Sequence, residues 1–204
     1  MQRSQIHIMS YNLLASRLCS NQIFPYASDQ VCDFKFRGPR IIEEIASSQA
    51  SLICLQEIDQ INEFYDEKLK NLGFNMVYGL RENKFDARLG AEVENHTIAI
   101  GYKADEWVLI DTEMVHFEYE SMARVYPGLP TEMKPKQAML CLFKHILSNE
   151  TVVVGNTHFE HSPALDHVKF AQACFYLEKI AKYIRDNKTT TESLPFITGG
   201  DFNA

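Results

Sequence analysis

The most informative stretch of this chain is Gly199-Gly200-Asp201-Phe202-Asn203-Ala204. An apolar run at residues 194–198 leads into its two glycines, and a carboxylate and a carboxamide follow two positions apart. This order predicts a buried strand with polar side chains at its carboxyl end, which is where open α/β sheets place their chemistry. The stretch therefore predicts an α/β fold with a polar site at its strand ends.

Three earlier segments end in a similar way. Residues 5–11 alternate apolar and polar side chains, while residues 51–55 and 151–155 are apolar runs, and all three patterns predict strands. The polar residues that close these strands and the last one are Asn12, Glu57, Asn156, His158, Asp201 and Asn203. Residues two positions apart on a strand share a face, so the side chains of Asn156 and His158 should point to the same side, as should those of Asp201 and Asn203. We expect these strand ends to converge on one site.

Helices are predicted where apolar residues recur at helical spacing. The first begins at Pro39, because a missing N–H costs nothing at a helix start. The second spans residues 62–72 and stops at Gly73, and the third runs from Leu165 to Asn187. Further strands are predicted at 74–78, 97–102, 107–110 and 137–146, the middle two as a hairpin, with connections at 13–36, 81–94 and 116–136. A single α/β domain over residues 1–204 accounts for these elements.

The composition narrows the class of protein. Hydrophobic residues make up 46% of the chain and charged residues 23%, which is ordinary for a globular domain. The net charge of −7 disfavours a nucleic-acid binder that relies on a wide basic surface. A phosphate substrate held by metal ions is compatible with this charge, because the cations neutralise the site locally.

The sequence also bears on where the protein works. No stretch approaches the about 18 consecutive apolar residues of a membrane span, and residues 1–8 lack the apolar segment of a secretory signal. The five cysteines are widely spread and include no Cys-x-x-Cys pair, which predicts reduced thiols rather than disulfides or zinc ligands. We therefore expect an intracellular protein, with cytoplasm, nucleus and mitochondria left open.

The side chains at the strand ends suit a magnesium site. They offer carboxylate and amide oxygens, which are the ligands that Mg²⁺ prefers, and they include no thiolate. Mn²⁺ is the alternative ion. Each residue also has a plainer interpretation, since a strand-terminal Asn usually forms a turn and a lone Glu after a strand is usually solvated. His158 and His161 form a His-x-x-His pair, which is weak evidence for zinc without a helix or a third ligand. The shared position at strand ends favours the functional interpretation.

Four motifs occur in the order seen in the endonuclease/exonuclease/phosphatase superfamily. They are Met9-Ser10-Tyr11-Asn12-Leu13-Leu14, Leu55-Gln56-Glu57-Ile58, Gly155-Asn156-Thr157-His158 and Gly200-Asp201-Phe202-Asn203-Ala204. The predicted helix over Arg37 to Ile45 and the segment Lys169 to Ala173 match as well. On these residues the chain resembles the superfamily over essentially its whole length, and within it the branch of deadenylases, nocturnin and angel proteins.

The resemblance implies a four-layer α/β sandwich, in which two packed β-sheets are flanked by helices. It also implies Mg²⁺-dependent hydrolysis of a phosphodiester, as in a 3′-exoribonuclease that acts on RNA or another adenylate-containing substrate. Glu57 is implied as the principal metal ligand, and Asn12 as a residue beside the metal that helps to bind phosphate. Asn156 is implied in substrate binding.

The same resemblance implies roles for three residues near the end of the chain. His158 would contact the scissile phosphate and stabilise its developing charge. Asp201 would orient or deprotonate the attacking water, and Asn203 would support the metal or the phosphate.

The sequence departs from the family pattern at two places. Asn95-His96 stands where family members commonly have Asp-Gly. Family members also continue past Asp-Phe-Asn with further strands and a terminal Ser-Asp-His motif. We therefore expect a domain that is truncated after the Gly-Asp-Phe-Asn motif, lacks the C-terminal strands and has little activity alone.

Three hypotheses follow. The first is a Mg²⁺-dependent phosphodiesterase of which this chain is the N-terminal part. The second is a catalytically inactive interaction subunit, whose open sheet edge pairs with a protein partner. In the third, a second polypeptide supplies the missing tail. The four retained motifs favour the first.

Overall fold

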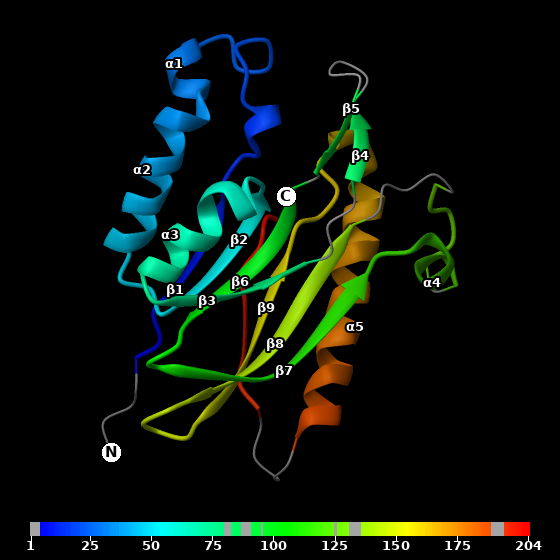
Figure 1. Ribbon diagram of the computed structural model, residues 1–204. Coiled ribbons are helices and arrows are strands. Elements are labelled where there is room, and N and C mark those ends of the chain that lie inside the picture. The colour runs from blue at the N-terminus through cyan, green and yellow to red at the C-terminus, as the bar shows by residue number, and fades with distance from the viewer. Residues whose placement is uncertain are drawn as a thin grey trace. The chain divides into compact units, whose positions relative to one another are not determined.

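The computed structural model describes residues 5–79, 83–86, 91–94, 96–124, 126–130, 136–188 and 194–204, with 83–86 and 91–94 described by their backbone only. The chain divides into two compact units, Met1–Glu106 and Trp107–Ala204. Each unit is built around a mixed four-stranded sheet with helices beside it (Figure 1).

The sheet of the first unit contains, in spatial order, β1 (Ile8–Asn12), β2 (Leu52–Ile58), β6 (Thr97–Lys103) and β3 (Phe74–Tyr78). Strand β1 runs parallel to β2, and β6 runs antiparallel to both of its neighbours. A parallel pair needs a crossover connection, which here contains η1 (Ser16–Leu18), α1 (Asp29–Cys32) and α2 (Phe34–Ser47). The carboxyl ends of β1 and β2 consequently lie at one edge, where Asn12 pairs with Gln56.

The helices of the first unit cover an apolar core. Strand β2 is buried along its whole length, and α2 contributes Ile41 and Ile45. The π-helical turn η2 (Ile61–Tyr65) and α3 (Asp66–Asn71) contribute Tyr65 and Leu69. A separate two-stranded antiparallel sheet consists of β4 (Asn83–Asp86) and β5 (Ala91–Glu94).

The sheet of the second unit contains, in spatial order, β10 (Phe196–Thr198), β9 (Thr151–Thr157), β8 (Gln137–His145) and β7 (Trp107–His116). Its helical elements are α4 (Tyr119–Ala123), η3 (Pro163–Leu165) and α5 (Asp166–Asn187). Strand β10 is parallel to β9, and α5 lies in the crossover between them. The carboxyl ends of β9 and β10 therefore share an edge, as those of β1 and β2 do.

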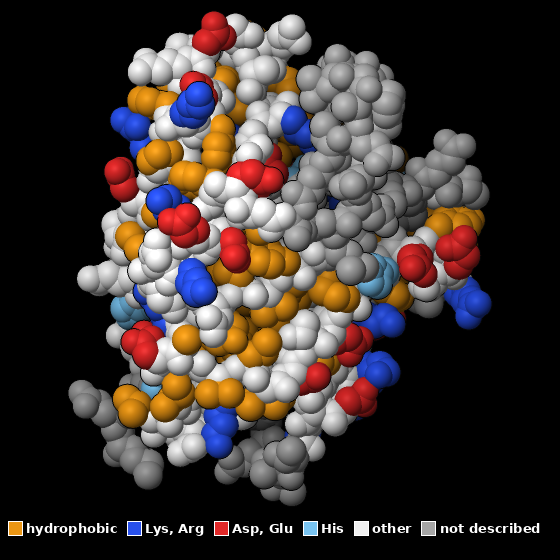
Figure 2. All heavy atoms as spheres, viewed as in Figure 1, with side chains coloured by type: hydrophobic (Ala, Val, Ile, Leu, Met, Phe, Trp, Pro, Cys, Tyr) orange, Lys and Arg blue, Asp and Glu red, His pale blue; other side chains and the backbone are white. Residues whose placement is uncertain are grey.

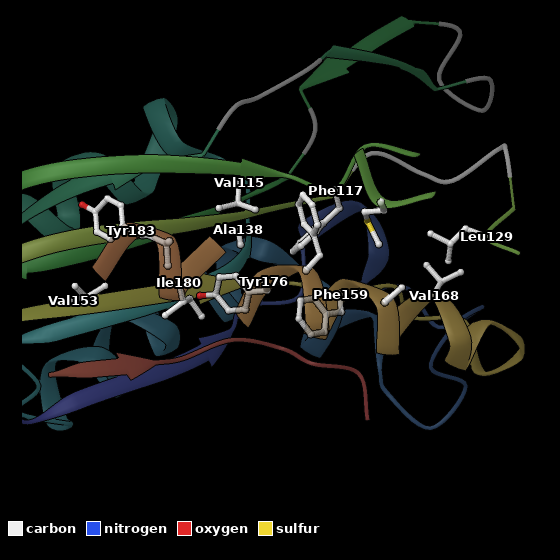
Figure 3. Close-up of a cluster of buried hydrophobic side chains, with 14 of the residues drawn as sticks. Val115, Phe117, Leu129, Ala138, Val153, Phe159, Val168, Tyr176, Ile180 and Tyr183 are labelled. Carbon is white, nitrogen blue, oxygen red and sulfur yellow. The ribbon is translucent and has the colours of Figure 1, made fainter. Parts of the chain in front are cut away.

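Figure 3 shows the core between α5 and the sheet of its unit. The Tyr176, Ile180 and Tyr183 side chains of α5 belong to one buried cluster with residues of β7, β8 and β9. The ring of Phe117 lies 5.6 Å from that of Phe159 in an edge-to-face arrangement. This packing fixes the backbone directly after β9, because Phe159 follows His158.

Replacement of Gly155 by alanine should destabilise the second unit. A Cβ atom at Gly155 would overlap the hydroxyl of Tyr176, which shares a hydrogen bond of 3.1 Å with the Thr198 hydroxyl. Overpacking of this kind costs about 1–3 kcal/mol, which denaturant unfolding would measure. The added substitution Tyr176→Phe should recover part of the loss, since it removes the overlapping oxygen. Wild-type stability of the Gly155→Ala variant would contradict this description of the packing.

The first predicted helix begins earlier than expected. Helix α2 starts at Phe34, and Pro39 lies inside it rather than at its first position. The carboxylate of Asp33 accepts a hydrogen bond of 2.9 Å from the Lys35 N–H, so this residue caps the helix. A favourable cap and the burial of Ile41 and Ile45 outweigh the backbone hydrogen bond that Pro39 cannot make.

The expected hairpin at residues 97–110 is also wrong. Strand β6 pairs with β2 and β3, whereas β7 pairs with β8 over nearly its whole length, so the two strands belong to different sheets. The predicted connection at 81–94 contains β4 and β5. Parts of the connections at 81–94 and 116–136 lie outside the described residues, as does Asn95, where the sequence departs from the family pattern. The predicted strand at 74–78 and the long third helix are confirmed.

On the face drawn in Figure 2, acidic and basic side chains are interspersed rather than gathered by sign. Among the described residues, no helix is both long and apolar enough to cross a membrane.

Candidate active site

In the first unit, Asn12 and Glu57 lie together at the ends of β1 and β2. The amide Nδ2 of Asn12 donates a hydrogen bond of 3.1 Å to Oε1 of Glu57. The backbone N–H of Ala15 donates a hydrogen bond of 3.1 Å to the other carboxylate oxygen. Glu57 is only 9% exposed, so both of its oxygens are fixed by neighbours and the carboxylate has one orientation.

A β-bulge turns Glu57 out of the regular strand. Between Leu55 and Ile58 the pairing of β2 with β6 shifts its register, and the backbone of Glu57 has a φ of 55°. A non-glycine residue in this region costs about 1–3 kcal/mol, and such strain is concentrated at functional sites. The sequence placed Glu57 just after a strand; the structure places it within the strand, at its irregular end.

The loop after β1 is held in place by groups that the sequence did not single out as site residues. The guanidinium of Arg37 donates to the carbonyl oxygens of Leu13 at 3.1 Å and Leu14 at 2.8 Å. Asp59 accepts a hydrogen bond of 2.6 Å from the Ser16 backbone N–H and one of 3.1 Å from the Ser16 hydroxyl. These bonds fix the residues on both sides of Ala15, which is a donor to Glu57.

Asp59 and Tyr65 lie in a partly desolvated environment. Burial raises the pKa of the Asp59 carboxyl, although its hydrogen bonds from Ser16 and the charge of Arg37 act in the opposite direction. Burial raises the pKa of the Tyr65 hydroxyl as well, so the phenol is neutral throughout the ordinary pH range. The charge of Arg37 lowers the pKa of both groups, so this residue, which also holds the loop, balances the charge of the cluster.

The Arg37→Ala variant should lose stability in the first unit. It leaves the carbonyls of Leu13 and Leu14 without their donor, and unpaired buried carbonyls cost about 1–3 kcal/mol. A matched control is Arg40→Ala, because Arg40 is exposed and its guanidinium contacts the carbonyl and the ring of Phe36 in its own helix. Thermal unfolding of both variants checks this. An Arg40→Ala variant that loses as much as Arg37→Ala would contradict it.

In the second unit, His158 and Asp201 meet at the ends of β9 and β10. The two residues form a parallel β-bridge, and Nε2 of His158 lies 3.9 Å from Oδ2 of Asp201. The backbone of Gly200, with a φ of 151°, makes this approach possible, since a Cβ there would lie 2.8 Å from the Thr157 carbonyl oxygen. Gly200 therefore permits a close passage of one strand against the other.

Asn203 and Asn156 take different positions. The Asn203 N–H donates a hydrogen bond of 3.0 Å to Oδ1 of Asp201, and its amide Nδ2 donates to the Phe159 carbonyl at 3.1 Å. Asn203 thus joins the His158–Asp201 group and orients Asp201. Asn156 lies within β9, opposite Met139, and is fully buried.

Glu160 is a further buried carboxylate that the sequence did not indicate. It is 5% exposed, and its Oε1 accepts hydrogen bonds of 3.0 Å from the backbone N–H groups of His161 and Ser162. Burial would raise the pKa of Glu160, but these hydrogen bonds and the charges of Lys136 and His161 hold it below its usual value. A depressed folded-state pKa means that this carboxylate stabilises the fold at neutral pH and ceases to do so as the pH falls through that pKa. The hydrogen bonds to the Glu160 carboxylate fix the turn that follows His158.

The donor set of the first unit fits a magnesium ion. Both Glu57 oxygens accept hydrogen bonds, a carboxylate oxygen has more than one lone pair, and Mg²⁺ is commonly bound by one or two carboxylates together with water. No three His, Cys, Asp or Glu side chains in the described ranges are grouped closely enough to hold a metal ion on their own. The structure thus brings together Asn12 with Glu57, and His158 with Asp201 and Asn203; that the two groups form one site stays a prediction.

Comparison with known proteins places this geometry in a family context. No family model matches the chain. The subunit Ccr4 of the Neurospora crassa CCR4-Not complex, named a 3′-5′-exoribonuclease, is 27% identical over 194 residues, which cover 88% of this chain and 24% of that protein. The structure of ANGEL2, named a 2′,3′-cyclic phosphatase, matches 97% of this chain and 53% of its own with a TM-score of 0.78 at 23% identity.

Two further solved structures match the fold of this chain. The human nocturnin catalytic domain matches 98% of this chain and 65% of its own with a TM-score of 0.73 at 20% identity. An endonuclease/exonuclease/phosphatase family protein from Bacteroides thetaiotaomicron matches 97% of this chain and 63% of its own with a TM-score of 0.64 at 17% identity. The fold is that of the endonuclease/exonuclease/phosphatase superfamily.

The predicted α/β fold class is therefore confirmed, as is the resemblance to the deadenylase, nocturnin and angel branch of this superfamily. The chain spans between 24% and 32% of the length of the curated relatives it matches. It spans about half to two thirds of the matched solved structures, from 52% to 66%.

Proposed function

We propose that this chain carries residues of a Mg²⁺-dependent phosphodiesterase that acts on RNA as a deadenylase-like 3′-exoribonuclease. The observation that carries the proposal is the Glu57 carboxylate, which is buried, strained in its backbone and held by Asn12 and Ala15 at the end of two parallel strands. A structural carboxylate would gain nothing from this strain, whereas a ligand must be held in one orientation.

Glu57 and Asn12 are the proposed holders of the ion. When bound there, Mg²⁺ supplies positive charge to a phosphoryl oxygen and to the attacking water. The hydrogen bonds from the Asn12 amide and the Ala15 N–H hold the Glu57 carboxylate in one orientation. The residues of the first unit thus orient one ligand rather than move a proton.

Proton transfer and phosphate binding fall to the second unit. Asp201 is the proposed base that orients the attacking water: its Oδ1 accepts the Asn203 N–H, which fixes the carboxylate, and its Oδ2 lies 3.9 Å from Nε2 of His158. His158 is the proposed donor to a non-bridging phosphate oxygen, whose charge grows in the transition state. Asn203 acts through Asp201, and the buried Asn156 supports the strand from which His158 extends.

The names of the matched relatives support RNA as the substrate class. The matched curated relatives are named as 3′-5′-exoribonuclease subunits of the CCR4-Not complex, and the match covers 88% of this chain. The net charge of −7 disfavours a substrate held along a long basic track but is compatible with a phosphate bound at a local metal site.

A panel of phosphodiesters with Mg²⁺ tests the proposal on the full-length protein. The panel contains oligo(A) RNA, a mixed-sequence RNA, an adenylate dinucleotide and a 2′,3′-cyclic adenylate, each assayed with wild type and with Glu57→Ala. We expect stepwise release of adenylate from the 3′ end of oligo(A), lost on chelation of the metal and in the variant. Equal rates for the two proteins would refute the assignment of Glu57, and no cleavage of any substrate would refute the function.

A further inference from the structure

The connection between η1 and α1 presents an aromatic ring to solvent. The Tyr26 residue is 87% exposed, and its ring lies 6.1 Å from that of the half-buried Phe24 in an edge-to-face arrangement. Ile23 and Val31, which are 52% and 45% exposed, belong to the same short segment. Exposed apolar side chains that gather in one segment mark a contact surface. We call residues 20–28 the aromatic loop.

The aromatic loop is held in shape by its own hydrogen bonds. The Asn21 amide donates a hydrogen bond of 2.7 Å to Asp29, which joins the start of the loop to α1. The Phe24 N–H donates one of 2.8 Å to the Ser20 carbonyl. The Tyr26 ring therefore projects from a preformed turn, so a ligand that binds it orders little additional backbone.

Both ends of the segment that carries this loop are tied to the Glu57 group. Before the loop, the Ser16 N–H donates a hydrogen bond of 2.6 Å to Asp59. After it, Arg37 donates to two backbone carbonyls of the turn that follows β1. Figure 1 shows α1 beyond the carboxyl ends of β1 and β2. A strand with its 3′ end at Glu57 can therefore pass the aromatic loop with nucleotides further from the cleaved bond.

The charge around the aromatic loop differs from that of the whole chain. The chain has a net charge of −7, whereas residues 16–40 are net positive, with four basic and two acidic side chains (Arg17, Lys35, Arg37, Arg40, Asp29 and Asp33). Asp29 accepts the Asn21 amide and Asp33 caps α2, while Lys35 and Arg40 are exposed. Positive charge beside an exposed ring complements the phosphates and bases of a nucleic acid better than it complements a second copy of this acidic chain.

We propose that the aromatic loop binds an unpaired nucleobase of an RNA strand, with Tyr26 as the stacking ring and Lys35 and Arg40 beside the phosphates. Every base has a π-face, so stacking of this kind tolerates any sequence. The identity of the ligand as substrate rests on the proposed function. Since the contact lies away from the cleaved bond, it contributes to affinity for the strand and leaves the chemical step to Glu57 and its partners.

The test measures binding of a fluorescent oligo(A) RNA to the full-length protein by anisotropy, with a chelator present so that the RNA stays intact. Tyr26→Ala should bind about 5-fold or more weakly than the wild type. Tyr26→Phe keeps the ring and should bind as the wild type does. Tyr26→Leu is the matched control for apolar area without a ring, and it should bind as weakly as Tyr26→Ala. Because residue 26 is exposed, thermal unfolding should be unchanged in all three variants.

An abasic oligomer of the same length separates the bases from the phosphates. The wild type and Tyr26→Ala should bind it equally, since it offers nothing to stack. Lys35→Ala should weaken binding of both oligomers alike, because it removes a charge beside the phosphates. The proposal would be overturned by equal affinity of wild type and Tyr26→Ala for oligo(A), by an equal loss on the abasic oligomer, or by a wild type that binds no oligo(A).

Turnover with Mg²⁺ separates this inference from the proposed function. In an active protein, Tyr26→Ala should raise KM for oligo(A) and leave kcat unchanged. If the wild type cleaves no substrate but its binding of oligo(A) depends on the Tyr26 ring, the function is refuted and the nucleobase site stands. Sedimentation of wild type and Tyr26→Ala covers the other occupant. A dimer that Tyr26→Ala abolishes, with oligo(A) affinity unchanged, would assign the loop to a second copy of the chain and refute the proposal.

Discussion

Full-length protein with Glu57→Gln is expected to hydrolyse phosphodiesters about 100- to 1000-fold more slowly than the wild type at saturating Mg²⁺. Glutamine keeps the shape of the side chain but removes its charge. It also places an N–H₂ group against either the Asn12 amide or the Ala15 N–H, both of which now donate to Glu57. Initial rates over a range of Mg²⁺ concentrations measure the effect.

The control for this variant is Glu43→Gln, because Glu43 is an exposed carboxylate on α2 of the same unit. It should leave the rate unchanged. A Glu57→Gln protein that folds normally and keeps wild-type activity would remove Glu57 from the mechanism. A loss explained by unfolding would appear in the thermal transition, which separates the two causes.

The second large effect is expected for His158→Gln, with a rate about 100-fold or more below that of the wild type. His158 is 8% exposed and lies 3.9 Å from the Asp201 carboxylate, so its imidazole has a defined direction and a polar partner. Glutamine retains one donor but not the geometry of the ring. The decrease should fall on kcat, since the proposed bond to phosphate strengthens in the transition state.

His161→Gln serves as the matched control for His158. His161 lies three residues later, and its side chain is 59% exposed beside Glu160. A substitution there should change kcat by less than about twofold. Equal losses in the two variants would mean that the whole turn, rather than the His158 imidazole, determines the rate.

The strand ends could be predicted because apolar patterns in this chain are long and clean. The residues of β3 and α5 match their expected ranges closely, and Asn12, Glu57 and His158 lie at strand ends as predicted. The parallel pairing of β1 with β2 and of β9 with β10 then follows from the intervening helices. The polar residues of both groups could therefore be identified from the sequence.

The supporting contacts could not be predicted, since they join residues far apart in the chain. Nothing in the sequence indicates that Arg37 reaches the Leu13 and Leu14 carbonyls, or that Asp59 binds Ser16. The bulge at Glu57 likewise depends on its partner strand.

Local patterns failed where a tertiary partner decided the outcome. Strand β6 finds its neighbours in β2 and β3, so the short spacing to β7 did not produce a hairpin. Helix α2 starts before Pro39, because the Asp33 cap and the burial of apolar side chains along the helix stabilise this earlier start.

The central claim is that the Glu57 group and the His158 group serve one reaction, and a double-mutant cycle tests it most directly. The rates of wild type, Glu57→Gln, His158→Gln and the double variant are measured on oligo(A) RNA with Mg²⁺. Residues that act as a unit are strongly non-additive, so the double variant should be within about threefold of the slower single variant. A double variant slowed by the full product of the two single effects would contradict the claim.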